Sequence, residues 1–288
     1  MRLTRFEDVA AFRARAEPFL LAHEAAHCLQ LGILATLSEQ PDEYPLPPYL
    51  ALVGEGEHVA AVALRTPPHN LVLSLLREDA PQAAALDVIA ADLAPLQPDL
   101  PGVLGPAPLS LAFAEAWQRR TGRAFQPGKR DRIYELTAVR GVSGVPGRLR
   151  AATTADRDLL VTWVDAFFIE AAPEPGPFDA EDWVEHLFAS PLRGAYLWED
   201  GGPVSLACTG GTTPNGARIG PVYTPPEQRG HGYASAVTAA LSQLLLERGR
   251  RFCFLFTDLA NPTSNHIYQA IGYQPVCDVD IYHFAAAR

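Results

Sequence analysis

The chain has 288 residues, 48% of them hydrophobic, and a formal net charge of −10 at pH 7. Its length favours two domains that each bury a core, and its negative charge argues against nucleic acid as a partner. Because it has no uncharged run of about 18 apolar residues and no signal-peptide pattern at the N-terminus, we expect a cytoplasmic protein, monomeric or homodimeric, that binds no membrane.

The four cysteines, Cys28, Cys208, Cys253 and Cys277, are widely spaced and form no C-x-x-C motif. This spacing indicates reduced, mostly buried thiols rather than disulfides or a metal site.

The first half begins with a helical pattern and continues with strands. Apolar residues recur at helical spacing from Phe6 to Leu37. Residues 49–53 and 59–64 alternate as a hairpin, and a third strand follows near Leu71 to Leu75. Pro81 opens a helix that ends near Leu93.

A segment rich in proline and glycine, from Pro95 to Pro108, predicts a loop. Ser110 is then expected to cap a helix ending near Arg120, and residues 133–139 to form a closing strand. Gly141 to Gly147 holds three glycines and a proline in seven residues, which predicts a linker between two domains.

The second half follows the same order. A strand at residues 149–152 precedes Thr153 and Asp156, which are spaced as a capping box for a helix over 157–170. Asp179 is expected to cap the next helix. The later elements are a hairpin of 195–198 and 204–209, a strand at 218–224, a helix ending before Gly249, a strand at 252–257, a helix at 264–271 and a strand at 278–284.

The turn between Arg229 and Ala234 joins a strand to a long helix and predicts a phosphate site. Its glycines, Gly230 and Gly232, leave consecutive backbone N–H groups accessible to an anion. The unpaired N–H groups and the positive end of the dipole at the following helix N-terminus also favour phosphate.

This turn follows Val222-Tyr223-Thr224 and fits the pattern Q/R-x-x-G-x-G/A at Arg229, Gly232 and Ala234. It resembles the acyl-CoA pyrophosphate loop of the GNAT acyltransferase superfamily. The P-loop and Rossmann patterns do not fit.

A second segment, from Asn261 to Tyr273, resembles the GNAT pattern N-x-x-S-x-x-x-Y-x-x-x-G-F/Y. The resemblance implies that Asn261 offers its amide to pantetheine, that Ser264 caps the helix, and that Tyr268 protonates the departing thiolate. Tyr268 is therefore the expected catalytic residue, with a buried core tyrosine as the alternative reading.

The resemblance implies an N-acetyltransferase that moves an acetyl group from acetyl-CoA to a primary amine of a small molecule or peptide, by direct attack in a ternary complex. The alternative is a non-catalytic CoA-binding module. No metal is implied. The residues expected to bind the co-substrate are Val222, Tyr223, Thr224, Arg229, Gly230, His231, Gly232, Tyr233, Ala234, Asn261 and Ser264.

The two halves also match at their ends, because Arg132–Leu136 follows Gly122 much as Asp280–Phe284 follows Gly272. We therefore expect a mixed α/β (α+β mixed sheet) fold, with two GNAT-like acyl-CoA N-acyltransferase domains in tandem.

The expected boundaries are a degenerate domain over residues 1–140, a linker over 141–147 and a catalytic domain over 148–288. The first domain is degenerate because its counterpart of the turn, Leu75–Pro81, contains no glycine and carries two carboxylates, Glu78 and Asp79, which would repel a pyrophosphate. We expect it to be structural or to act as a lid.

The general base is open, because the strand at 218–224 contains no carboxylate. Candidates are Glu170, Glu199, Asp200, His186 and a water chain. An acidic stretch favours a cationic acceptor, although a solvated surface would give the same pattern. Its members are Asp165, Glu170, Glu174, Asp179, Glu181, Asp182 and Glu185.

A remote alternative comes from His23-Glu24-Ala25-Ala26-His27, since H-E-x-x-H on a helix is the zincin signature. A zinc hydrolase also needs a third ligand, and no downstream E-x-x-x-D helix supplies one.

Overall fold

The computed structural model describes residues 1–171, 178–190 and 193–286, which form two compact units. The first unit holds the described residues of Met1–Ile133, Thr257–Ala260 and Val276–Arg288, and the second holds those of Tyr134–Phe256 and Asn261–Pro275. Residues from 276 onward, expected in the second domain, thus belong to the first unit.

The first unit is a sheet with two pairs of helices. Its elements are β1 (Arg2–Phe6), α1 (Val9–Leu21), α2 (Cys28–Glu39), the short η1 (Pro41–Glu43), β2 (Tyr49–Glu55), β3 (His58–Arg65), β4 (Leu71–Leu73), α3 (Gln82–Leu96), β5 (Gly102–Pro106), α4 (Ala107–Thr121), most of β6 (Phe125–Leu136) and most of β12 (Gln274–Phe284). The strands β1-β2-β3-β4-β5-β12 are neighbours in that order, with β4 and β5 parallel and the other pairs antiparallel.

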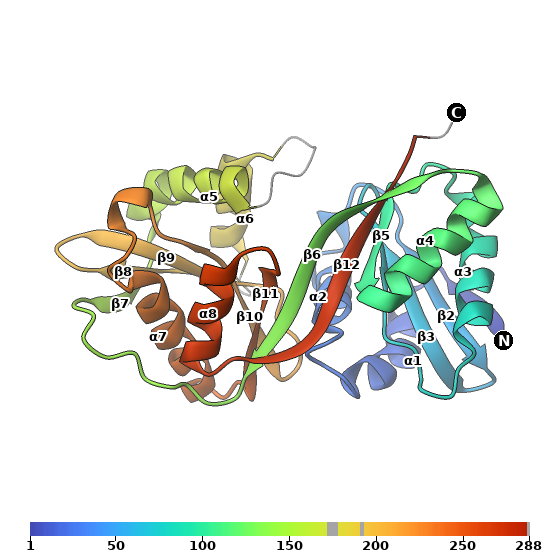
Figure 1. Cartoon of the computed structure of the whole chain (residues 1–288), viewed down its shortest axis with the longest axis horizontal. Coiled ribbons are helices and arrows are strands. Elements are labelled where there is room, and N and C mark those ends of the chain that lie inside the picture. The colour runs from blue at the N-terminus through green and yellow to red at the C-terminus, as the bar shows by residue number, and fades with distance from the viewer. Residues whose placement is uncertain (172–177, 191–192, 287–288) are drawn as a thin grey trace. The chain divides into compact units, whose positions relative to one another are not determined.

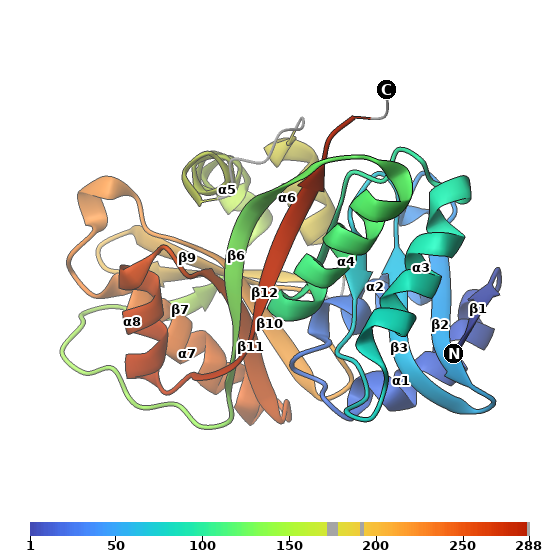
Figure 2. The same cartoon turned by 45° about the vertical axis from the view of Figure 1, so that its right-hand side comes forward.

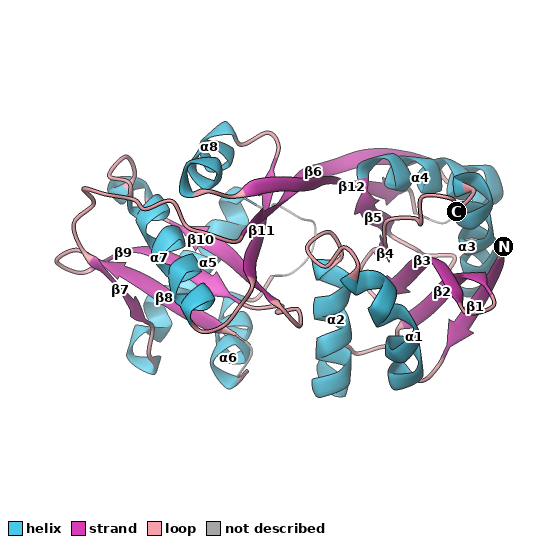
Figure 3. Cartoon of the chain, turned by 90° about the horizontal axis from the view of Figure 1, so that it is seen from below, coloured by secondary structure: helices cyan, strands magenta, loops and turns pink. Residues whose placement is uncertain are grey.

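Side chains of the first unit alternate between two cores, as strand geometry requires. In β2, Leu50 and Leu52 pack with helices α1 and α2, whereas Ala51 and Val53 pack with α3 and α4. Figure 2 shows α3 and α4 in front of the strands, and Figure 3 shows α1 and α2 on the opposite side.

The second unit repeats this arrangement. Its elements are β7 (Arg148–Ala151), η2 (Thr154–Asp156), α5 (Arg157–Ala171), α6 (Ala180–Ala189), β8 (Gly194–Glu199), β9 (Pro203–Thr209), β10 (Gly216–Tyr223), η3 (Pro226–Gln228), α7 (Tyr233–Glu247), β11 (Phe252–Asp258) and α8 (Pro262–Ile271). The strands are neighbours in the order β7-β8-β9-β10-β11, and the β10–β11 pair is parallel.

In β8, Leu197 packs with α5 and α6, whereas Tyr196 and Trp198 pack with α7. Helices α5 and α6 therefore cover one face of this sheet and α7 covers the other (Figure 1). The predicted mixed α/β repeat is confirmed. It extends to the helix ends, because Gly122 and Gly272 both terminate a helix in the left-handed conformation, with φ of 72° and 119°.

Two local predictions of helix starts in the second half are confirmed. Thr153 and Asp156 form the capping box, here on the short turn η2 that leads into α5. Asp179 caps α6 by accepting hydrogen bonds from the backbone N–H groups of Glu181 and Asp182.

The helical pattern predicted from Phe6 to Leu37 contains two helices separated by a turn, and a short strand that was not predicted precedes them. Two predictions for the first half are wrong. The expected loop at 95–108 contains β5, and Ser110 lies inside α4 rather than at its cap. The sequence did not indicate strand β5 because its glycines are typical of a loop. The strand requires glycine at position 102, since a Cβ there would lie 2.3 Å from the Tyr282 carbonyl oxygen of the neighbouring strand.

None of the helices that the structure describes combines the length and apolar composition needed to cross a membrane. The four cysteines are free thiols, and all except the half-buried Cys277 are buried.

Candidate functional site

The candidate site lies where β10 and β11 part. The two strands pair in parallel over Gly216–Arg218 and Phe252–Phe254. Beyond that point the described part of β10 pairs with β9, where the register shifts between Ile219 and Val222. The end of β10 consequently has a strand edge that β11 does not cover.

The glycine turn follows directly and opens helix α7. Gly230 and Gly232 have φ of +83° and +81°, which residues with a Cβ rarely adopt, and both are exposed. Gly232 is the N-cap and provides no side-chain cap. The first intrahelical bond runs from Ala236 N to Gly232 O at 3.0 Å, so the N–H groups of residues 233–235 have no partner within the helix. These features fit a pyrophosphate group.

Arg229 does not direct its guanidinium toward this helix start. Its Nη2 donates to Glu170 Oε2 at 2.6 Å, and its Nε donates to the Thr224 carbonyl at 2.9 Å. The guanidinium also lies over the Tyr223 ring, 5.8 Å from the centroid. The side chain thus joins the turn to the end of α5 and to the end of β10.

Tyr223 completes this cluster, because its hydroxyl donates to Glu170 Oε1 at 3.2 Å. Burial and the Glu170 carboxylate raise the pKa of Tyr223, so its hydroxyl stays protonated at neutral pH. The Tyr223 ring packs toward α5, 6.3 Å from that of Trp163, whereas Val222 packs with the core under α7.

The polar groups at the end of β10 are bound to β9. Ser205 Oγ donates to the Tyr223 carbonyl at 3.1 Å and lies 2.8 Å from the Thr224 hydroxyl. With the bond from Arg229 to the Thr224 carbonyl, the carbonyls of Tyr223 and Thr224 each have one protein partner.

The other side of the turn is held by Tyr233. Its hydroxyl donates to Asp200 Oδ2 at 2.6 Å, and its ring stacks on exposed His231 at 5.5 Å. This hydrogen bond raises the pKa of Tyr233. Asp200 was one of the candidate bases, but its carboxylate is hydrogen-bonded to Tyr233 and stabilises the turn.

Asn261 is the N-cap of helix α8, because its Oδ1 accepts a hydrogen bond from Ser264 N at 3.0 Å. The prediction that Ser264 caps this helix is wrong, because the helix starts at Pro262 and places Ser264 in its first turn. Among the described residues, the Asn261 side-chain NH₂ has no hydrogen-bond partner, so it can donate to a ligand.

Tyr268 is half-buried on α8, with its ring 5.9 Å from that of Tyr273. Burial raises the pKa of Tyr268 to about 12. Within the described parts of the chain its hydroxyl makes no hydrogen bond. The group is thus protonated at neutral pH and available to donate, as a general acid must be.

The remaining candidate bases are engaged elsewhere. Glu199 accepts from Arg150 at 2.7 Å and from Arg148 at 3.3 Å, and the hydrogen bond from Arg150 lowers its pKa. His186 Nδ1 lies 2.8 Å from the Asp182 carbonyl on its own helix.

Several residues of the acidic stretch also have partners away from β10. Glu181 and Glu185 pair with Arg157, and Asp179 caps α6. Of the described residues in that stretch, Glu170 is the acidic one that contacts β10, whereas Glu174 lies outside the described residues.

At the corresponding place, the described residues of the first unit have neither the uncovered strand edge nor the glycine turn. After β4, the Leu75 N–H donates to His27 Nε2 at 3.0 Å, and the Arg77 N–H donates to the Ala60 carbonyl at 2.9 Å. The segment that follows carries Glu78 and Asp79 and no glycine. The backbone N–H groups of Leu75 and Arg77 are therefore already bonded to protein.

His27 belongs to the H-E-x-x-H motif, which forms a turn between α1 and α2 rather than a helix. Because Nε2 accepts from Leu75, Nδ1 carries the proton and donates to the Leu20 carbonyl at 2.9 Å. Both ring nitrogens thus have protein partners, and the prediction that this motif lies on a helix, as in the zincin signature, is wrong. Among the described residues, no group of three or more His, Cys, Asp or Glu could hold a metal ion.

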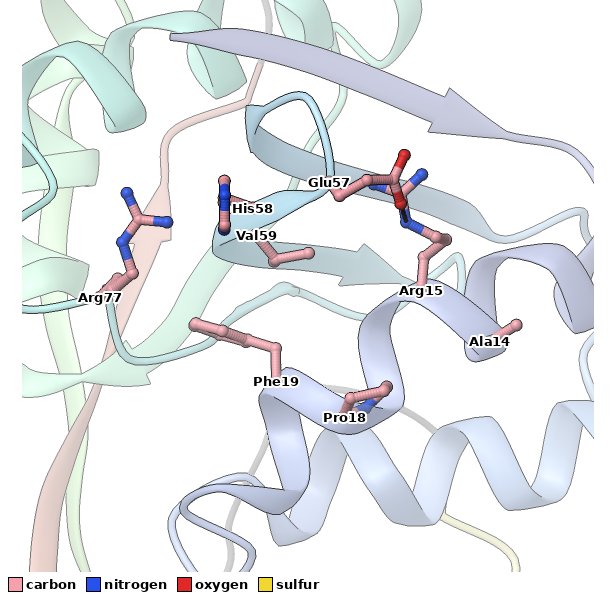
Figure 4. Close-up of a pocket in the computed structure, with 8 residues that line it drawn as sticks. All are labelled: Ala14, Arg15, Pro18, Phe19, Glu57, His58, Val59 and Arg77. Carbon is pink, nitrogen blue, oxygen red and sulfur yellow. Dashed lines mark ion pairs between the residues drawn. The ribbon is translucent and has the colours of Figure 1, made fainter.

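A hollow of about 370 Å³ lies elsewhere in the first unit, between α1 and the start of β3 (Figure 4). Arg77 and His58 lie at one end of it and Arg15 with Glu57 at the other. Its arginines are paired, Arg15 with Glu57 at 3.5 Å and Arg77 with Asp79.

Comparisons with known proteins support the fold. The family described as FR47-like protein matches residues 200–280, which include the glycine turn and α8. Among curated proteins, none matches this chain.

Several solved structures match nearly the whole chain, of which three are described here. A Drosophila protein solved by a structural genomics consortium has a TM-score of 0.70 and 13% identity, covering 98% of each chain. A GCN5-related N-acetyltransferase from Sphaerobacter thermophilus has a TM-score of 0.60 and 16% identity, covering 99% of this chain and 95% of its own. A tandem GNAT protein from the clavulanic acid biosynthesis pathway has a TM-score of 0.57 and 14% identity, covering 100% of this chain and 98% of its own.

The chain therefore has the tandem GNAT fold along its length, and the recognition of that fold from the sequence is confirmed.

Proposed function

We propose that the second unit is an N-acetyltransferase that moves an acetyl group from acetyl-CoA to a primary amine by direct attack in a ternary complex. One observation carries the proposal: β10 parts from β11 directly before a glycine turn that opens the uncapped helix α7. A strand edge for an amide-containing arm and an N-terminus for a pyrophosphate thus occur in succession.

In this proposal the pyrophosphate lies on the N–H groups at the start of α7, between Gly230 and Ala234. The pantetheine arm lies along Val222–Thr224 and receives a hydrogen bond from the Asn261 amide. A backbone N–H at the end of β10 binds the carbonyl oxygen of the thioester; one such donor is typically worth about 10²–10³ in rate.

The chemistry then needs little else from the protein. The ammonium ion first loses a proton to solvent, and the neutral amine nitrogen then bonds to the thioester carbonyl carbon and loses a second proton to solvent. The carbon–sulfur bond breaks with its electron pair on sulfur. The thiolate takes the hydroxyl proton of Tyr268, which afterwards recovers a proton from solvent. Starting from the ammonium ion, each turnover yields an amide, CoA thiol and one released proton.

Two solved structures of the same fold are described as a GCN5-related N-acetyltransferase and a tandem GNAT protein, which supports this reaction class. The acceptor we propose is a small molecule or peptide with a cationic amine, since Glu170 places a carboxylate beside β10.

The test is release of CoA thiol from acetyl-CoA across a panel of primary amines, with CoA binding measured in parallel by calorimetry. Amine-dependent thiol release supports the proposal. Tight CoA binding with no release for any amine would leave a CoA-binding module instead.

A further inference from the structure

We infer that the acceptor is a primary amine bearing an aromatic or other apolar group, with its ammonium held by Glu170 and its apolar part against the rings of Phe167, Phe168 and Phe178. The inference rests on the proposed acetyl transfer and names the class of its second substrate.

Glu170 is positioned to hold an ammonium ion. Its two carboxylate oxygens receive one bond each, from Tyr223 and from Arg229. Since a carboxylate has about four lone-pair sites, each oxygen can accept one more donor. The side chain is 43% exposed, so the remaining sites face solvent.

This carboxylate also lies close to the expected reaction centre. Tyr223 is the last residue of β10, and the Arg229 Nε donates to the carbonyl of Thr224. An ammonium ion on Glu170 is therefore within a few atoms of the strand edge along which we place pantetheine.

An aromatic surface is formed by Phe167 and Phe168, which lie on the same helix as Glu170, and by Phe178, which precedes α6. Phe167 precedes Glu170 by three residues, which places the two side chains as neighbours on α5. The rings of Phe167 and Phe168 are 5.4 Å apart, and those of Phe168 and Phe178 are 3.9 Å apart. We call these three rings the phenylalanine surface.

The phenylalanine surface is incompletely covered by the described protein. Phe178 is 38% exposed, and Phe167 and Phe168 are only partly buried. Apolar rings beside a half-exposed carboxylate match a ligand with an apolar body and a cationic end. A small polar amine would leave this surface in water.

The experiment compares two probes with the same amine and different bodies, 2-phenylethylamine and ethanolamine. A third probe, 2-phenylethanol, has the ring without the ammonium. Binding to the full-length protein saturated with CoA is measured by calorimetry, and kcat/KM is measured by thiol release.

For the wild-type chain we expect 2-phenylethylamine to bind at least about tenfold more tightly than ethanolamine, as burial of part of a phenyl ring implies. Phe178→Ala should reduce that preference about threefold, whereas Leu111→Ala, an exposed apolar residue of the first unit, should leave it unchanged. Glu170→Gln should weaken both amines about tenfold and leave 2-phenylethanol unaffected. Circular dichroism checks that each variant is folded.

The outcomes separate this inference from the proposed function. Thiol release with no preference between the two amines overturns the inference and leaves the acetyltransferase. A preference that persists unchanged in Phe178→Ala, or an amine affinity that is unchanged in Glu170→Gln, also overturns it. A preference in binding that Phe178→Ala weakens, together with weaker binding of both amines in Glu170→Gln, supports this site. If no thiol is released in that case, it is the proposed acetyl transfer that fails.

Discussion

His27 Nε2 accepts the backbone N–H of Leu75 at a distance of 3.0 Å, and its Nδ1 donates to the Leu20 carbonyl. The imidazole is 1% exposed, and burial lowers the pKa of His27 to about 4 from the ordinary value of 6.5. This histidine therefore connects the α1–α2 turn to the segment after β4 only in its neutral form.

The first prediction is a pH-dependent loss of stability. Above pH 6.5 neither the folded nor the unfolded chain protonates this group; as pH falls from 6.5 to about 4, the unfolded chain does and the folded chain does not. The free energy of unfolding should fall by about 3 kcal/mol over that range because of His27. It is measured by urea unfolding at successive pH values.

His27→Gln is the matched control, because an amide offers one donor and one acceptor and does not titrate. Its unfolding free energy should fall less than that of the wild type by about 3 kcal/mol between pH 7.5 and 4. Parallel pH profiles would show that His27 is not the titrating group.

The second prediction concerns Tyr268. Tyr268→Phe should lower kcat by about 10²–10⁴ because the thiolate loses its acid, while acetyl-CoA affinity changes little. Since the pKa of Tyr268 is about 12, wild-type kcat should show no loss from its ionisation up to pH 10. Steady-state kinetics checks both statements. An unchanged kcat would assign Tyr268 to packing alone.

The third prediction tests the start of α7 as a phosphate site. Ala234→Glu puts a carboxylate in the first turn, where the helix dipole tolerates it but a bound pyrophosphate would be repelled. Acetyl-CoA affinity should fall by about 100-fold or more, since like charges in contact cost several kcal/mol. Ala234→Gln, of the same size and uncharged, should lose far less. Calorimetry decides, and equal losses in the two variants would point to bulk rather than charge.

The fourth prediction is stoichiometric. Because the Leu75 N–H is bonded to His27 and the following segment carries Glu78 and Asp79, calorimetry should find one acetyl-CoA per chain. Ala234→Glu should remove that single binding event. A second site that survives in this variant would place acetyl-CoA in the first unit as well.

The glycine turn could be predicted from the sequence because its requirements are local. Gly230 and Gly232 need a positive φ, and the helix that follows has its own periodicity, so spacing alone identifies the arrangement. The role of Arg229 could not be predicted this way. Its partner Glu170 is 59 residues away in the chain, and the pattern carries no sign of that ion pair.

The difference between local requirements and partners distant in the chain also explains the predictions that were wrong. Asn261 and Ser264 are both good capping residues, and the choice between them depends on where Pro262 starts the helix. His27 sits in a motif with a familiar metal meaning, yet its actual partner, Leu75, is 48 residues away. Only the fold brings them together.

Strand β12 pairs with β5, from Val279 opposite Pro106 to His283 opposite Gly102, so the last strand of the chain completes the sheet of the first unit. During synthesis, that unit must remain without this strand until nearly all of the second unit has been made. A fragment ending at residue 140 would expose the unpaired edge of β5 and be prone to aggregate. Division of the gene at the apparent linker therefore would not yield an intact first unit.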